Sequence, residues 1–102
     1  MSTTDTTTDK PNTIEIKCLL FAKVKEMILG EHSKDDSVIV NLPANKCTTH
    51  QLISELKLKY PNISNLLDVC MVAVNLEYID RSNDLEIKKR DEVAIIPPVS
   101  GG

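Results

Sequence analysis

Apolar and charged residues alternate over residues 14–20, at the start of the patterned part of the chain. One face of this stretch would carry Ile14, Ile16, Cys18 and Leu20. A period of two predicts a half-buried strand. Because Leu19 and Phe21 interrupt the alternation, we expect the end of the strand to be covered on both faces.

The apolar spacing then changes from two to three and four residues. Val24, Met27 and Ile28 would share one face of a short helix over residues 22–29, which Gly30 would end. After a polar loop the alternation returns. The second predicted strand carries Val38, Val40 and Leu42 and ends at Pro43.

The strongest helix signal begins at Thr48. Thr48 and Gln51 have the spacing of a capping box, and Pro61 would close the helix. Its apolar face would consist of Leu52, Ile53, Leu56 and Tyr60. We expect residues 62–68 to form one more short helical turn.

Residues 69–74 form an uninterrupted apolar run, which predicts a strand buried on both faces. Asn75 and Leu76 would turn the chain into a short strand at residues 78–79. The last strand is predicted over residues 92–96. It would end at Pro97, because proline has no N–H for the ladder.

One helix of about three turns cannot cover both faces of a four- to five-stranded sheet. The pattern therefore predicts an α+β domain with one main helix packed on one face of the sheet. We expect residues 1–12 to be a disordered Thr-rich arm, since little in them is apolar. Residues 13–97 would form the domain and residues 98–102 an extended tail.

Composition narrows the class of protein. The 102 residues suffice for one domain, and with three aromatic residues its core must be mainly aliphatic. A net charge of −3 argues against a nucleic-acid or anionic-membrane surface. No apolar run approaches the roughly 20 residues that span a bilayer, and the first residues do not resemble a signal peptide. Three widely spaced cysteines suggest a reducing compartment, so we expect the cytosol.

Common chemical motifs are missing from the sequence. His32 and His50 have no Cys, Asp or Glu at metal-ligand spacing, so we expect no metal site. One internal glycine cannot make a phosphate loop. Cys18 and Cys70 are expected to be core thiols. Cys47 would lie in a loop as the most exposed of the three, and unreactive because no base lies beside it.

The C-terminal tail is the most informative segment. Its residues are Pro97, Pro98, Val99, Ser100, Gly101 and Gly102. Glycine permits a close approach that a Cβ would block, and paired prolines favour a stiff stem. We therefore expect a thin tail that enters a narrow slot, with the terminal carboxylate of Gly102 as the working group. A carboxylate must be activated before transfer, usually as an acyl-adenylate.

Three segments resemble the small subunits of molybdopterin synthase, sulfur carriers with the ubiquitin-like β-grasp fold and its mixed sheet. Residues 20–26 are similar to the family's first strand and short helix. Residues 73–78 are similar to its third-strand pattern, and residues 91–102 to its C-terminal signature. The resemblance spans residues 14–102.

This resemblance implies a carrier without catalytic side chains of its own, acting within a sulfurtransferase complex. A ubiquitin-activating-enzyme-like adenylyltransferase would use ATP to convert Gly102 to a glycyl adenylate and then a thiocarboxylate (1-thioglycine). No cofactor would be bound permanently. The tail would insert into the large subunit and donate sulfur to the pterin precursor, forming the molybdopterin dithiolene. Two small and two large subunits would assemble, with Phe21, Ile95 and Ile96 contacting the large subunit.

Two positions depart from the family pattern. Arg90 stands where glycine is usual, so a turn with positive φ would be strained there. Lys25 stands where arginine is common and cannot form a bidentate fork. The basic run at residues 88–90 is expected to be a solvated turn, with partner docking as the alternative. Rival functions are a sulfur carrier for thiazole synthesis or tRNA thiolation, and a noncovalent β-grasp interaction module.

Overall fold

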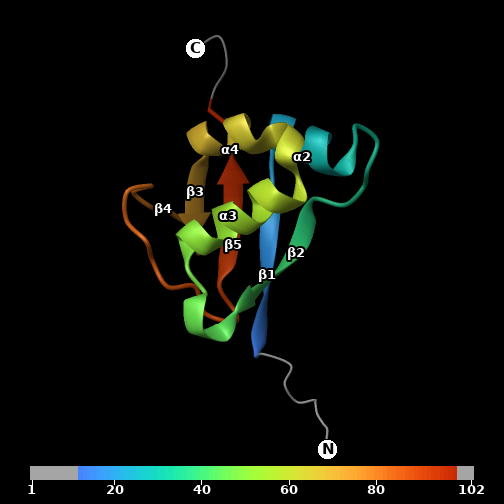
Figure 1. The fold of residues 1–102 in the computed structure, drawn as a ribbon. Coiled ribbons are helices and arrows are strands. Elements are labelled where there is room, and N and C mark those ends of the chain that lie inside the picture. The colour runs from blue at the N-terminus through green and yellow to red at the C-terminus, as the bar shows by residue number, and fades with distance from the viewer. Residues whose placement is uncertain (1–11, 99–102) are drawn as a thin grey trace, which may run out of the picture.

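A computed structural model describes residues 12–98, and within them five strands form one mixed sheet in the order β2-β1-β5-β3-β4. The strands are β1 (Thr13–Leu20), β2 (Ser37–Pro43), β3 (Met71–Val74), β4 (Glu77–Tyr78) and β5 (Glu92–Ile96). β1 and β5 are parallel, and the other neighbouring pairs are antiparallel. The predicted α+β class and mixed sheet are confirmed (Figure 1).

Helices cover one face and one end of this sheet. They are α2 (Ala22–Leu29), α3 (Thr49–Lys59) and α4 (Ser64–Val69), with 3₁₀ turns at Ala44–Lys46 and Pro61–Ile63. Figure 1 shows α3 across one face of the sheet, with α2 and α4 near the carboxyl ends of β1 and β5. The main helix is therefore where the sequence predicted it, and the short helical turn before β3 is confirmed as α4.

The core lies between α3 and the sheet face that it covers. Alternation along β1 and β5 sends every second side chain into this layer, as predicted. The largest fully buried side chains are Ile16, Leu20, Val24, Leu42, Leu52, Leu56, Ile63, Leu67, Val72, Ile87, Val93 and Ile95. Ile87 comes from the long connection before β5, which the hydrophobic pattern did not assign to the core.

Local signals set the ends of the helices. The Thr48 hydroxyl accepts a hydrogen bond from the Gln51 backbone N–H at 3.2 Å, so the predicted cap of α3 forms. Among the described residues no hydrogen bond runs from the Thr48 backbone N–H to the Gln51 side chain, so the reciprocal half of the capping box is absent; the Gln51 amide N–H donates to the Glu55 carboxylate. α2 ends at Gly30, whose φ of 93° is a conformation that favours glycine.

Three predictions from the apolar pattern need correction. Residues 69–74 are not one strand buried on both faces: Val69 ends α4 and is 58% exposed, and Met71 is 41% exposed at the start of β3. A short apolar run does not distinguish a helix end from a strand. The end of β1 is not covered on both faces either, because Phe21 is 45% exposed. The short strand after the turn lies one residue earlier than predicted.

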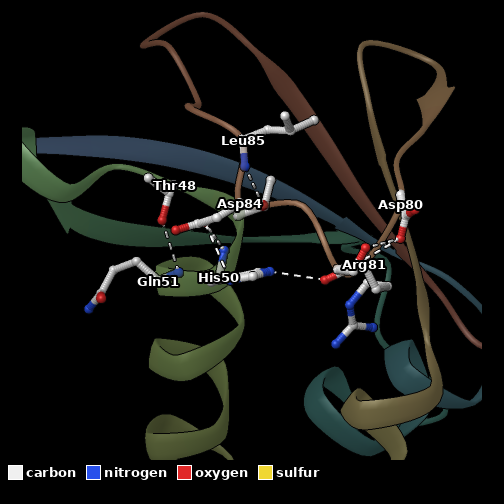
Figure 2. A network of polar contacts seen from close by, with 9 residues as sticks. Thr48, His50, Gln51, Asp80, Arg81, Asp84 and Leu85 are labelled. Carbon is white, nitrogen blue, oxygen red and sulfur yellow. Dashed lines mark hydrogen bonds and ion pairs between the residues drawn. The ribbon is translucent and has the colours of Figure 1, made fainter.

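A polar network fixes the loop that follows β4 (Figure 2). His50 donates its backbone N–H to the Asp84 carboxylate at 2.9 Å, and its ring Nε2 lies 2.9 Å from the Arg81 carbonyl oxygen. The bond from His50 holds the pKa of Asp84 below its ordinary value. The Arg81 guanidinium donates to the Leu67 and Cys70 carbonyls at the end of α4. His50 therefore has a structural role, because it holds this loop against the start of α3.

Arg90 lies in a turn that does not require the positive φ expected at this position, so its backbone is not strained in that way. The Asp91 N–H donates to the Lys88 carbonyl at 2.9 Å, and the Lys88 N–H donates to the Asp91 carboxylate at 2.8 Å. Arg90 is not among the residues with positive φ. The turn thus differs from one built on a left-handed glycine. Lys88, Lys89 and Arg90 are all exposed, as expected of a solvated turn.

Candidate docking site at the base of the C-terminal tail

A groove, here called the tail-end groove, opens where β5 ends and the tail begins. Its volume is about 700 Å³. Its walls come from the start of α2, from α4 and from the residues after β5. The lining residues are Phe21, Ala22, Lys23, Leu66, Ile96, Pro97 and Pro98. Six of these seven residues are apolar, and Lys23 adds one positive charge at the rim.

The groove continues onto the sheet face opposite the helices, here called the open face. Odd-numbered β1 residues and even-numbered β5 residues point to this side, because Ile16, Cys18 and Leu20 fill the core. A pocket of about 160 Å³ lies on it. Its lining is Leu19, Phe21, Ala73, Leu76, Tyr78, Glu92, Ala94 and Ile96. Phe21 and Ile96 belong to both surfaces, so the two are continuous.

Strained backbone flanks this apolar surface. Ala22, at the rim of the tail-end groove, has φ 51°. Asn75 and Leu76 have φ 53° and 72°, as a two-residue hairpin turn between β3 and β4 requires. Asparagine tolerates this region, but a branched leucine is rarely found there. Leu76 is nonetheless 90% exposed beside the open face. Such strain is frequent at functional sites.

Asn75 ties the hairpin turn to the start of β5. Its backbone N–H donates to the Glu92 carbonyl at 2.8 Å, and its side chain bridges the Asp91 carboxylate and the Glu92 N–H, each at 2.9 Å. Asp91 also accepts from the Lys88 N–H, and these bonds hold its pKa below the ordinary value. The position of Leu76 is therefore fixed by neighbouring hydrogen bonds rather than by its own packing.

The predicted site residues fall into three groups. Phe21, Ile96, Pro97 and Pro98 lie together in the tail-end groove. Ile95 is fully buried in the core, so its predicted contact with a partner is wrong. Adjacent strand residues point to opposite faces, and Ile95 and Ile96 therefore cannot share one surface. Val99, Ser100, Gly101 and Gly102 lie outside the described residues.

The described residues offer docking surface rather than reactive side chains. All three cysteines are free and buried. Burial raises the pKa of Cys18 to about 12 and also raises those of Cys47 and Cys70, so all three stay protonated at neutral pH. Cys47 is the most exposed of the three, as predicted, but it is buried rather than open to solvent. Between residues 12 and 98 we find no cluster of His, Cys, Asp or Glu that could hold a metal ion.

Comparison with known proteins identifies the family to which this chain is similar. Residues 18–102 match the ThiS family, a match that includes the groove-lining residues and the tail. The chain belongs to the ThiS family. A relative of this ThiS-family chain from Dictyostelium discoideum, named molybdopterin synthase sulfur carrier subunit, is 52% identical over 88 residues. That alignment covers 86% of this chain and 96% of the relative.

Solved structures show the ThiS-family chain to have a ubiquitin-like β-grasp fold. The small archaeal modifier protein 1 of Methanosarcina acetivorans superposes with a TM-score of 0.67 at 22% identity, covering 89% of this chain and 99% of that one. A chain from the complex of subunits 1 and 2 of the Helicobacter pylori molybdopterin-converting factor gives 0.56 at 22% identity, covering 87% and 100%. None of the helices in the described part of the chain is long and apolar enough to cross a membrane.

Several surface residues were missed by the sequence analysis. Leu66 enters the tail-end groove from α4, and Leu76 and Tyr78 border the open face. The signal available for Leu76 was a leucine in a hairpin turn, where polar residues or glycine are usual. Leu66 had no such signal, because only the packing of α4 against α3 brings it to the groove.

Proposed function

We propose that this chain is the sulfur-carrier subunit of a molybdopterin synthase and that Gly102 carries the sulfur. The tail-end groove supports this proposal, because Pro97 and Pro98 at the base of the tail form part of its lining. A partner that docks there holds the following four residues near its own surface. The family match extends to residue 102, and relatives that align over most of their length bear this name.

The proposed chemistry occurs at the terminal carboxylate in two steps. A carboxylate oxygen of Gly102 attacks the α-phosphorus of ATP, and pyrophosphate leaves. A donor of sulfide-level sulfur then attacks the acyl carbon and displaces AMP, so that the thiocarboxylate forms without a change of oxidation state. ATP is consumed by the activating enzyme, so this chain needs no resident cofactor. The chain supplies presentation, while the partner supplies orientation and charge stabilisation.

Two partners follow from these steps. An adenylyltransferase of the ubiquitin-activating type loads the tail, and the large synthase subunit takes the sulfur to the pterin precursor to form the dithiolene. We propose a complex of two small and two large subunits. The Helicobacter pylori relative was solved as a complex of subunits 1 and 2, which supports a large-subunit partner. Three free cysteines support a reducing compartment such as the cytosol.

Changing the end of the tail tests this proposal. Deleting Gly102, or adding one residue after it, should abolish sulfur transfer in an assay reconstituted with the large subunit and pterin precursor. Gly101→Val should also fail, because a β-branched side chain would obstruct a narrow slot. The circular dichroism spectrum should remain unchanged in all three variants. Full activity of the extended protein would refute the proposal.

A further inference from the structure

The turn between β3 and β4 holds a leucine where the backbone favours glycine. Asn75 and Leu76 are its two central residues, with φ 53° and 72°. Turns of this kind are most often Asn-Gly, because both central residues need a positive φ. Leu76 is also the most exposed large apolar side chain in the part of the chain that the structure describes, at 90%. It therefore buries little area in the isolated chain, while its backbone conformation lowers stability.

Hydrogen bonds on both sides hold this turn in one position. Asn75 is bonded to Glu92 through its backbone N–H at 2.8 Å and through its side chain at 2.9 Å. After the turn, the Ile79 N–H donates to the Val72 carbonyl at 2.9 Å. A contact residue whose backbone is already fixed loses less conformational freedom when a partner binds. The turn thus presents Leu76 in a conformation suited to a contact outside the chain.

Leu76 lines the pocket of about 160 Å³ on the open face, here called the open-face pocket. β5 runs from the turn that holds Leu76 to Ile96 at the base of the tail. A strand rises about 3.3 Å per residue, so the two ends of this surface are about 13 Å apart. Ala73 and Ala94 are paired across β3 and β5 and line the same pocket. These small side chains leave room for a protruding apolar side chain of a partner.

We propose that Leu76 is a contact residue for the large subunit, at the far end of an interface that begins in the tail-end groove. This inference rests on the proposed function. A stable interface covers roughly 800 Å² and 20–30 residues on each partner, whereas seven residues line the tail-end groove. A subunit of a lasting complex must therefore cover more of the chain.

The open face is the surface onto which this interface extends. It is apolar and is continuous with the tail-end groove through Phe21 and Ile96. An enzyme that loads the tail needs to bind only for each turnover, and transient complexes have the smaller interfaces. We therefore assign Leu76 to the large subunit rather than to the adenylyltransferase.

Titration calorimetry of the full chain with the large subunit tests this contact. Leu76→Asn removes the apolar side chain and introduces a residue that tolerates a positive φ. It should raise the Kd about tenfold or more, while also raising the midpoint of urea unfolding. Leu76→Met keeps an apolar side chain of similar volume, so its Kd should stay within about twofold of wild type. A merely structural role predicts that the more stable Leu76→Asn variant binds at least as well as wild type.

Leu58→Asn is the matched control, because it makes the same change at an exposed leucine elsewhere. Leu58 lies in α3, is 77% exposed and lines neither the tail-end groove nor the open-face pocket. This variant should bind the large subunit like wild type.

Three results would overturn the assignment of Leu76. One is a Leu76→Asn variant that binds like wild type although Phe21→Ala binds more weakly, which would leave the proposed function intact. Another is a Leu76→Asn variant that binds the large subunit normally but is loaded with sulfur more slowly, because Leu76 would then contact the adenylyltransferase. The third is a wild-type chain that does not bind the large subunit, which would refute this inference together with the proposed function.

Discussion

Truncation of Phe21 should weaken docking of the large subunit without unfolding the carrier. Phe21 is 45% exposed and lies where the tail-end groove meets the open face. A phenylalanine side chain can bury about 200 Å², so about 90 Å² remains for a partner to cover. At about 25 cal/mol per Å² this area is worth about 2 kcal/mol. Phe21→Ala should therefore raise the Kd for the large subunit on the order of 30-fold.

Titration calorimetry with the isolated large subunit measures this Kd, at a temperature where thermal unfolding shows the variant to be folded. Val69→Ala is a matched control, because Val69 is 58% exposed at the end of α4 but lines neither surface. It should bind like wild type. A Phe21→Ala variant that binds within twofold of wild type would show that the tail-end groove is not the docking surface.

Four further predictions concern the folded domain. Ile95→Ala should lower the free energy of unfolding by about 2–5 kcal/mol, because it leaves a cavity in the core; urea unfolding measures the loss. Thr48→Ala should cost about 1 kcal/mol through the lost cap of α3, and an equal stability in the same assay would contradict it. Leu76→Gly should raise the free energy of unfolding by about 1 kcal/mol, because it relieves a left-handed φ; a higher thermal midpoint would show this. In the folded protein the pKa of Asp91 lies below its ordinary value of 3.8. The free energy by which Asp91 stabilises the fold is therefore fully present above pH 3.8 and is lost as the pH falls through the lower pKa of the folded state. Asp91→Asn should therefore destabilise the protein at neutral pH and progressively less in acid, and a pH-independent difference in urea unfolding would contradict this.

Much of the fold could be predicted because short-range patterns determine it. The alternation along β1, the Thr48 cap and the stop at Gly30 each depend on residues within a few positions of one another. Residues 69–74 failed for a physical reason. The first apolar side chains of this run belong to the end of α4 and the later ones to β3, and a continuous apolar run contains no period that separates the two.

The candidate site could be predicted only in part. The tail signature is local in sequence, so Pro97 and Pro98, which line the tail-end groove, were predicted directly, while the role of the two glycines stays a prediction. The docking surface depends on which strand face the helices leave open. The family resemblance grouped Ile95 with Ile96 at the partner interface, although the pleat sends them to opposite sides. Leu66 and Leu76 join the surface through helix packing and a strained turn, neither of which the apolar pattern reveals.

The central claim is that Gly102 receives the sulfur, and intact-mass spectrometry tests it most directly. The chain would be incubated with ATP, an adenylyltransferase of the proposed type and a sulfur donor, beside a carrier known to be loaded under those conditions. The account predicts the mass increment of one sulfur replacing one oxygen, absent from the variant that lacks Gly102. An unchanged mass while the control carrier is loaded would contradict it.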